Sequence, residues 1–113
     1  MRRSVLLICA AGVVLAGPAI ATEAFVGHWA MKPEACKGSG NTPATAPLIA
    51  SDKSVSWFGG SCRIHKMYKL GQVIYVQALC GDGKNIPITL DAHGDRLKVT
   101  WDRGKPEELR RCR

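Results

Sequence analysis

The sequence predicts a small all-β protein, either an antiparallel β-barrel or a curled sheet of about six to eight short strands. Three observations support this fold class. Apolar and polar residues alternate with a period of two in the second half of the chain, and glycine-containing turns separate the alternating stretches. No apolar stripe with the period of a helix extends beyond about two turns. Four well-separated cysteines add a covalent frame to these strands.

The first 21 residues have the composition of an export signal. Arg2 and Arg3 precede the apolar run Val5–Leu15, and Ala19-Ile20-Ala21 fits the small-x-small pattern of a signal peptidase site. The apolar run is shorter than the ~20 residues that cross a bilayer, which disfavours the alternative of a single-pass anchor. We therefore expect cleavage after Ala21, no stable membrane anchor, and one domain over residues 22–113 in the periplasm or outside a bacterial cell.

A moderate positive charge remains after cleavage. The full chain has 16 lysines and arginines against 9 acidic residues, and removal of Arg2 and Arg3 lowers the net charge from +7 to +5. The basic residues are scattered except for a cluster at Arg110–Arg113. A scattered excess is typical of a solvated surface, so we expect no nucleic-acid binding, while attraction to an anionic lipid, glycan or protein stays open.

Four cysteines follow the expected signal, namely Cys36, Cys62, Cys80 and Cys112. An even number of cysteines in a short exported chain is typical of disulfides. A zinc site is the alternative, but it requires closely paired ligands, whereas the nearest two of these cysteines are 18 residues apart. We therefore expect two disulfides and no metal or cofactor.

The pairing of the cysteines follows from a predicted hairpin. Ser61–Lys69 and Gln72–Cys80 flank a turn that contains Gly71. If Cys62 lies opposite Cys80, the same face also carries the pairs Ile64/Ala78, Lys66/Val76 and Tyr68/Ile74. This mostly apolar face predicts the disulfide Cys62–Cys80 and leaves Cys36–Cys112. The second bond closes a loop of about 75 residues, which stabilises the fold by ~4 kcal/mol in the chain-entropy model.

A second predicted hairpin has the clearest alternation in the chain. With His93-Gly94 as a two-residue loop, Lys84–Leu90 and Asp95–Trp101 are expected to pair antiparallel. Their apolar face then contains the pairs Leu90/Leu97, Ile88/Val99 and Ile86/Trp101. Pro87 lacks a backbone donor, so the first strand is expected to be bulged or to lie near an edge.

The remaining elements are short. Strands are predicted at Pro47–Ala50, Ser54–Phe58 and Glu107–Cys112, with a short helix at Lys32–Cys36 and a mobile loop at Lys37–Pro47. A disulfide between the first and last parts of this order favours a closed sheet, which has no exposed edges.

The step Gly27-x-Trp29 resembles the opening of the lipocalin and calycin group. In that group a G-x-W on the first strand plugs one end of the barrel, and a basic residue of the last strand packs over the indole ring. The resemblance implies a structural plug made of Gly27, Trp29 and either Arg110 or Arg111, and we assign Arg111 to it. It also implies a carrier of small ligands.

A longer pattern spans most of the exported chain, with Gly27-His28-Trp29-Ala30 before Cys36, the pair Cys62 and Cys80, and a final Arg111-Cys112. This pattern is similar to uncharacterised small exported proteins of alphaproteobacteria, which imply no activity. The chain also resembles small-barrel bacterial metalloprotease inhibitors in size, export and G-x-W opening. Those proteins inhibit through a free N-terminal segment, which corresponds here to Thr22-Glu23-Ala24, and they usually have one disulfide where we expect two.

Catalytic motifs are weak in this sequence. Ser61, His65 and Asp82 contain the groups of a hydrolytic triad, but nothing in their spacing selects them and no G-x-S-x-G step is present. The stretch Cys80–Asn85 lacks the residues of a phosphate or calcium loop and is expected to be a turn. We therefore expect no catalytic residues and no enzymatic activity.

These features favour a non-catalytic module that binds or inhibits a protein, with a partner such as an exported or periplasmic hydrolase. The alternative is a lipocalin-like carrier, which requires an apolar cavity inside the barrel. Lys37–Pro47 is a second segment that can enter a partner's cleft. The candidate binding surface consists of Thr22, Glu23, Ala24, Trp57, Met67 and Tyr75.

Overall fold

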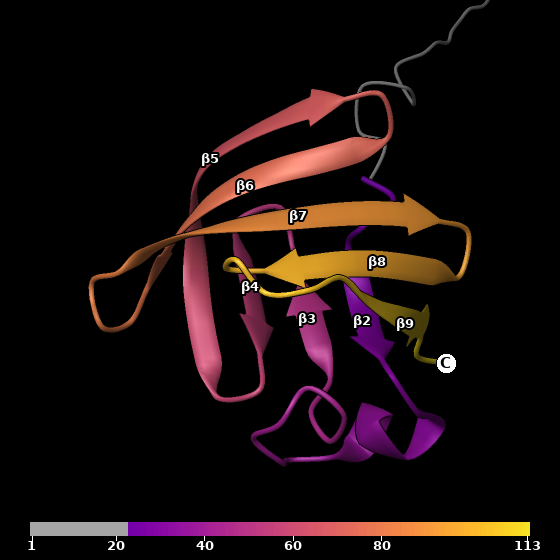
Figure 1. Cartoon of the computed structure of the whole chain (residues 1–113). Helices are drawn as coiled ribbons and strands as arrows, with labels where there is room; N and C mark the ends of the chain where they lie inside the picture. Colours follow the sequence, from indigo (N-terminus) through magenta and orange to yellow (C-terminus); the bar gives the residue numbers. More distant parts are fainter. Residues whose placement is uncertain (1–22) are drawn as a thin grey trace, which may run out of the picture.

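The computed structural model of the protein describes residues 23–113, so the expected signal peptide and Thr22 lie outside the described residues. The strands are β2 (Gly27–Ala30), β3 (Leu48–Ala50), β4 (Ser54–Trp57), β5 (Gly60–Leu70), β6 (Val73–Cys80), β7 (Asn85–His93), β8 (Arg96–Trp101) and β9 (Glu107–Arg111). Each strand pairs antiparallel with the next, and β9 pairs back with β2 (Figure 1). The predicted all-β fold is confirmed, and the sheet is a closed barrel.

A short 3₁₀ helix, η4 (Pro33–Lys37), follows β2 where the sequence predicts a short helix. Pro33 begins it, since a proline at the first position needs no hydrogen-bond partner for its nitrogen. The next segment, expected to be a mobile loop, contains a turn in which the Thr42 and Thr45 hydroxyl oxygens lie 2.6 Å apart, and it buries Ala46. Among residues 23–113, no helix has the length and apolar character needed to cross a membrane.

Inward-facing side chains fill the barrel. The alternation in β7 and β8 directs Ile88, Leu90, Leu97 and Val99 to the interior, and each is at most 1% exposed. The other large side chains that are fully buried are Phe25, Trp29, Leu48, Val55 and Leu109. No polar or charged residue of the described chain is buried, so apolar packing alone forms this core.

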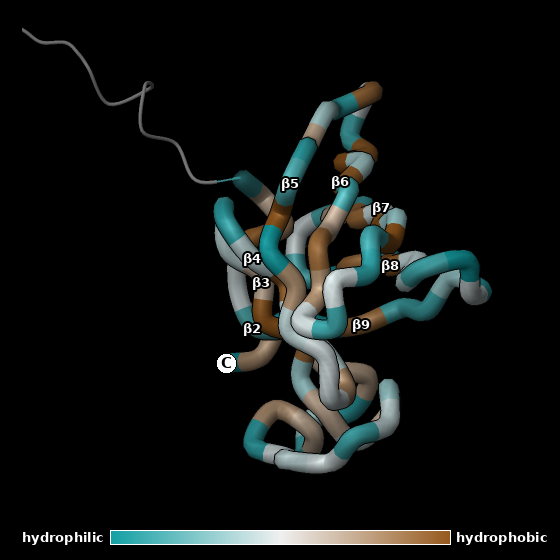
Figure 2. The backbone as a smooth tube through the Cα atoms, turned by 90° about the vertical axis from the view of Figure 1, so that its left-hand side faces the viewer, coloured by the Kyte–Doolittle hydropathy of each residue, from teal (hydrophilic) through white to brown (hydrophobic). Residues whose placement is uncertain are grey.

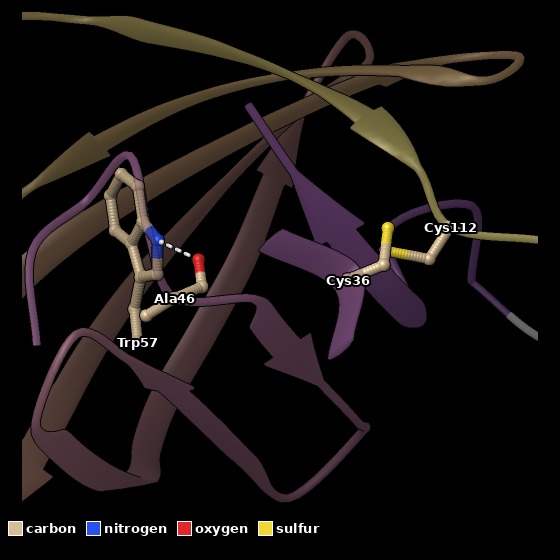
Figure 3. The surroundings of a disulfide bond; sticks show 4 residues. All are labelled: Cys36, Ala46, Trp57 and Cys112. Atoms are coloured by element: carbon tan, nitrogen blue, oxygen red, sulfur yellow. Dashed lines mark hydrogen bonds between the residues drawn. A yellow bond between two sulfur atoms is a disulfide. The ribbon is translucent and has the colours of Figure 1, made fainter. Parts of the chain in front are cut away.

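Both predicted disulfides are present. Cys62 and Cys80 lie directly opposite each other in the β5–β6 ladder, as the register predicts. Cys36 of η4 is bonded to Cys112, which follows β9 (Figure 3). The backbone N–H of Cys112 also donates to the carbonyl oxygen of His28 in β2 over 2.8 Å. The second disulfide therefore reinforces the seam at which β2 and β9 close the barrel.

The predicted register of the first hairpin is correct only up to Ile64/Ala78. A bulge at His65 then inserts one extra residue into β5, and the observed pairs become Lys66/Gln77, Met67/Val76 and Tyr68/Tyr75. The predicted pairs Lys66/Val76 and Tyr68/Ile74 are therefore wrong. Because successive side chains of a strand alternate between its faces, the extra residue directs Met67 inward and Tyr68 outward.

The second hairpin has the predicted inner face but a different register. Its loop is Gly94-Asp95 and not His93-Gly94, so Ile88 pairs with Trp101 and Leu90 with Val99. Gly94 has a φ of +63° at the first loop position, where the turns of two-residue hairpins require a positive φ that histidine rarely adopts. Pro87 pairs with Gln77 of β6 on one side. On its other side, the pairing of β7 with β8 begins one residue later, at Ile88, so Pro87 lies near an edge as predicted.

Candidate functional site

The residues expected to form a plug lie together at the seam between β2 and β9. Trp29 is fully buried, and its Nε1–H donates to the carbonyl oxygen of Phe25 over 2.9 Å. The guanidinium carbon of Arg111 lies 4.2 Å from the centroid of the indole ring, a distance typical of a cation–π interaction. Its Nη1 donates to the Val26 carbonyl over 3.0 Å and its Nη2 to the Ala24 carbonyl over 2.9 Å. Arg110, the other candidate, is exposed.

Gly27 leaves the space that this arginine occupies. Its φ is +145°, a region that side-chain-bearing residues avoid, and a Cβ atom built there would lie 2.6 Å from Nη1 of Arg111. The glycine of the G-x-W step is thus required by the guanidinium that covers the tryptophan. All three residues therefore stabilise the seam between β2 and β9.

Trp57 does not belong to a binding surface. Its side chain is 3% exposed, and its Nε1–H donates to the Ala46 carbonyl over 3.3 Å (Figure 3). Its ring also packs edge-on against Phe58 and Trp101, at centroid distances of 4.8 Å and 5.8 Å. The candidate role of Trp57 in a binding surface is wrong, because the loop before β3 covers this tryptophan.

Met67 and Tyr75 are accessible but lie on opposite faces of the β5–β6 hairpin. Met67 is 40% exposed on the inner face, whereas Tyr75 is half-buried on the outer face and stacks on Tyr68 at a centroid distance of 5.2 Å. Tyr68 and Leu70 are exposed too, at 56% and 60%. Sequence reasoning missed these two residues because it did not place the bulge at His65.

The second half of β5 is an unpaired strand edge. β4 pairs with β5 as far as Ser54/Arg63, and the N–H of Ile64 still donates to the Lys53 carbonyl over 2.8 Å. After the bulge at His65, residues 66–70 of β5 pair with β6 on one side, and from residue 65 to residue 70 no strand within residues 23–113 pairs with the other side. We call residues 65–70 of β5 the free edge. Figure 1 shows this part of β5 rising beyond β4.

The start of the described chain lies at the same end of the barrel. The carboxylate of Glu23 is 4.0 Å from the ammonium group of Lys69. A cleft of about 160 Å³ separates the two segments and is lined by Glu23, Ala24, Phe25, Lys69, Gln72, Ile74 and Ala92. The structure therefore brings Glu23 and Ala24 close to the hairpin that carries Met67. Thr22 lies outside the described residues.

Basic side chains flank the free edge. Arg63, Lys66 and Lys69 are all exposed on β5, together with His65 at the bulge. Among the described residues, Glu23 is the one carboxylate that forms an ion pair with any of them, and its 4.0 Å distance to Lys69 makes this a weak surface pair. The free edge thus combines exposed apolar side chains with positive charge that is little compensated.

The other candidate groups form no hydrogen-bonded triad among the described residues. Within the described part of the chain, no hydrogen bond joins Ser61, His65 and Asp82, and the Asp82 carboxylate instead accepts from the Lys84 N–H in the turn before β7. His93 Nε2 lies 2.7 Å from Asp91 Oδ1 on the outer face of the barrel, where the imidazole is 60% exposed. The Asp91 side chain is 26% exposed, so the pair lies at the surface with its carboxylate partly covered. Residues 23–113 contain no cluster of three metal-ligating side chains.

A second cleft, of about 320 Å³, lies beside the Cys36–Cys112 disulfide. Lys32, Lys37, Arg110 and Arg113 line it, and Arg113 also donates to Asp95 over 3.4 Å. Arg111 also lines this cleft, but its guanidinium donates to the backbone carbonyl oxygens of Val26 and Ala24, and the other four basic side chains are exposed. The cleft is a basic surface without a built site.

The fold and the free edge define a class of protein: a small β-barrel, closed by strand pairing and two disulfides, with one projecting hairpin that has an unpaired edge. Comparison of the chain with family models, curated proteins and solved structures finds no match.

Proposed function

We propose that this protein is a non-catalytic module that binds another protein through the free edge of β5. The proposal depends on the exposure of apolar side chains at this edge. Three of the four large hydrophobic side chains that are exposed in residues 23–113 belong to Met67, Tyr68 and Leu70. Exposed apolar side chains gathered on one hairpin among charged residues are typical of a protein interaction surface.

The shape of the hairpin agrees with this role. The β5–β6 hairpin projects beyond the barrel, and hydrophilic and hydrophobic residues alternate along it (Figure 2). A projecting element of this kind fits the cleft of a partner such as an exported hydrolase, and the inhibitor role expected from the sequence belongs to the same proposal. Two disulfides are typical of an oxidising compartment, which supports export to the periplasm or the cell exterior.

The carrier hypothesis has less support. A lipocalin-like carrier needs an apolar cavity inside the barrel, but Trp29, Leu90 and Leu97 are among the large side chains that occupy this interior. Small barrels whose interior side chains meet in the middle have no room for a ligand.

Site-specific photo-crosslinking tests the proposed function. The full chain is expressed in its native cells with p-benzoylphenylalanine in place of Tyr68, and a control carries the same group in place of Lys98, which is exposed on β8. We expect ultraviolet light to give one covalent adduct of defined mass from position 68 and none from position 98. Absence of an adduct from position 68, or the same adducts from both positions, would contradict the proposal.

A further inference from the structure

We infer that the partner supplies an extended acidic segment, which binds as an additional antiparallel or parallel strand along the free edge of β5. The inference deepens the proposed function, on which it rests, by naming the chemistry that this edge recognises. It depends on three features of residues 65–70: unpaired backbone groups, apolar side chains on both faces, and positive charge.

The backbone of the free edge is available for pairing. Successive residues of a β-strand direct their N–H and C=O groups to alternate sides, so every second residue from 65 to 70 directs these groups away from β6. By contrast, Val73–Leu79 of β6 has a partner on each side, in β5 and in β7. Six residues of strand span about 20 Å, which is the length of an ordinary strand. An extended peptide can therefore continue the sheet here by strand addition.

The side chains on both faces of the edge would contact the added strand. The inner face carries Met67 and Lys69, and the outer face carries Lys66, Tyr68 and Leu70. Each face therefore places a lysine beside an apolar side chain. Cross-strand neighbours stabilise a sheet when apolar residues meet apolar ones and opposite charges meet. The matching segment has apolar residues together with aspartate or glutamate.

The same lysines disfavour a second copy of this chain as the occupant. Two free edges paired with each other would bring Lys66 and Lys69 of one copy close to the corresponding lysines of the other. Lysines and bulges on an exposed edge are also the devices that prevent edge-to-edge aggregation. An acidic strand would instead be attracted to Lys66 and Lys69. If these lysines served only to prevent aggregation, the edge would bind no strand at all.

The test uses the exported protein, labelled with ¹⁵N and purified with both disulfides intact. The probe is an octapeptide of two Glu-Glu-Val-Val repeats with acetylated and amidated ends, because this order places glutamate and valine on both faces of an added strand. We expect the probe to shift the amide resonances of residues 65–70 and to slow their hydrogen exchange. The corresponding lysine–valine peptide is expected to bind about tenfold more weakly, because several charge pairs are reversed. The glutamate–valine peptide methylated at every amide nitrogen should leave these resonances unchanged.

Charge reversal of the edge provides a matched pair of variants. In K66E/K69E the preference should change to the lysine–valine peptide. In K84E/K105E, which makes the same change of charge at exposed positions away from the free edge, the preference for the glutamate–valine peptide should remain. Unchanged resonances in the rest of the barrel verify that each variant is folded.

Three results would overturn strand addition: no shifts at residues 65–70 with the acidic peptide, equal binding of its methylated form, or the same preference in both double variants. This failure is distinct from failure of the proposed function. If a crosslinked adduct forms at position 68 but the acidic peptide shifts no resonance of residues 65–70, the protein-binding role stands and strand addition is refuted. Peptide binding at the free edge without a cellular adduct refutes the proposed partner and supports the chemistry of the edge.

Discussion

At the scale of single residues, Arg111 joins two ends of the described chain through one guanidinium group. It belongs to β9, yet its two hydrogen bonds go to the carbonyl oxygens of Ala24 and Val26, which precede β2. The same group covers the ring of Trp29. These contacts hold Glu23–Phe25 beside the cleft near Lys69, so a structural residue also positions one side of the proposed binding region.

Replacement of Arg111 by alanine is expected to destabilise the protein. The change removes two charge-assisted hydrogen bonds, typically worth about 1.5–3 kcal/mol each, and a cation–π contact worth about 0.5–2 kcal/mol. Since water replaces part of these interactions at this half-buried site, we expect the free energy of unfolding to fall by about 2–3 kcal/mol. Urea denaturation with the disulfides intact measures this change.

Arg110→Ala is the control for this prediction. Arg110 is the neighbouring residue of β9, it is exposed, and it forms no ion pair among the described residues. Its loss should change the free energy of unfolding by less than about 0.5 kcal/mol. Equal losses for the two alanine variants would refute a specific role of the Arg111 guanidinium.

At the scale of elements, the bulge at His65 decides on which face of the sheet each later side chain of β5 lies. One additional residue moves every later side chain of the strand to the opposite face of the sheet, since the side-chain period is two. Tyr68, expected opposite Ile74, lies instead on the outer face against Tyr75. The bulge thus places Tyr68 and Leu70 on the outer face and Met67 on the inner face, and all three are exposed on the projecting hairpin.

Alanine substitutions on the two faces test this arrangement. Tyr68→Ala removes a stacked but exposed cross-strand pair, so we expect the free energy of unfolding to fall by about 1 kcal/mol or less. Ile74→Ala removes a side chain that is 6% exposed and should lower the same quantity by about 2–5 kcal/mol. Thermal or chemical denaturation of both variants gives the comparison. A loss for Tyr68→Ala as large as that for Ile74→Ala would show that the tyrosine is a core residue.

At the scale of the whole molecule, two disulfides act on very different lengths of chain. Cys62–Cys80 links neighbouring strands across 18 residues, and Cys36–Cys112 links the start of the barrel to its end across 76 residues. The longer loop costs the unfolded chain more entropy when it is closed. The Cys36–Cys112 bond also lies at the seam where β2 meets β9, so it supports the closure of the barrel directly.

The paired removal of each disulfide should therefore have unequal effects. In the chain-entropy model, Cys36→Ala/Cys112→Ala lowers the free energy of unfolding by about 4.5 kcal/mol, against about 3 kcal/mol for Cys62→Ala/Cys80→Ala. Guanidinium denaturation of the two double variants measures the difference. The reverse order of stability would show that strand pairing at the seam holds without its covalent link.

The sequence by itself determined the all-β class and both disulfides. The class and the first bond are encoded locally, because alternation with a period of two marks the faces of β7 and β8, and the parity of Cys62 and Cys80 places both on one face. The Cys36–Cys112 bond then follows by elimination. The turn at Gly94 was also readable in principle, since glycine is favoured at the first loop position of a two-residue hairpin, where φ is positive.

The tertiary structure alone decided the location of the candidate site. The four residues of β4 cannot cover the eleven residues of β5, but only the folded barrel shows which part of β5 remains unpaired. Burial of Trp57 depends on Ala46, and the approach of Glu23 to Lys69 joins segments far apart in the chain. Strand alternation is a property of neighbouring residues, whereas an unpaired edge depends on where distant segments of the chain end in space.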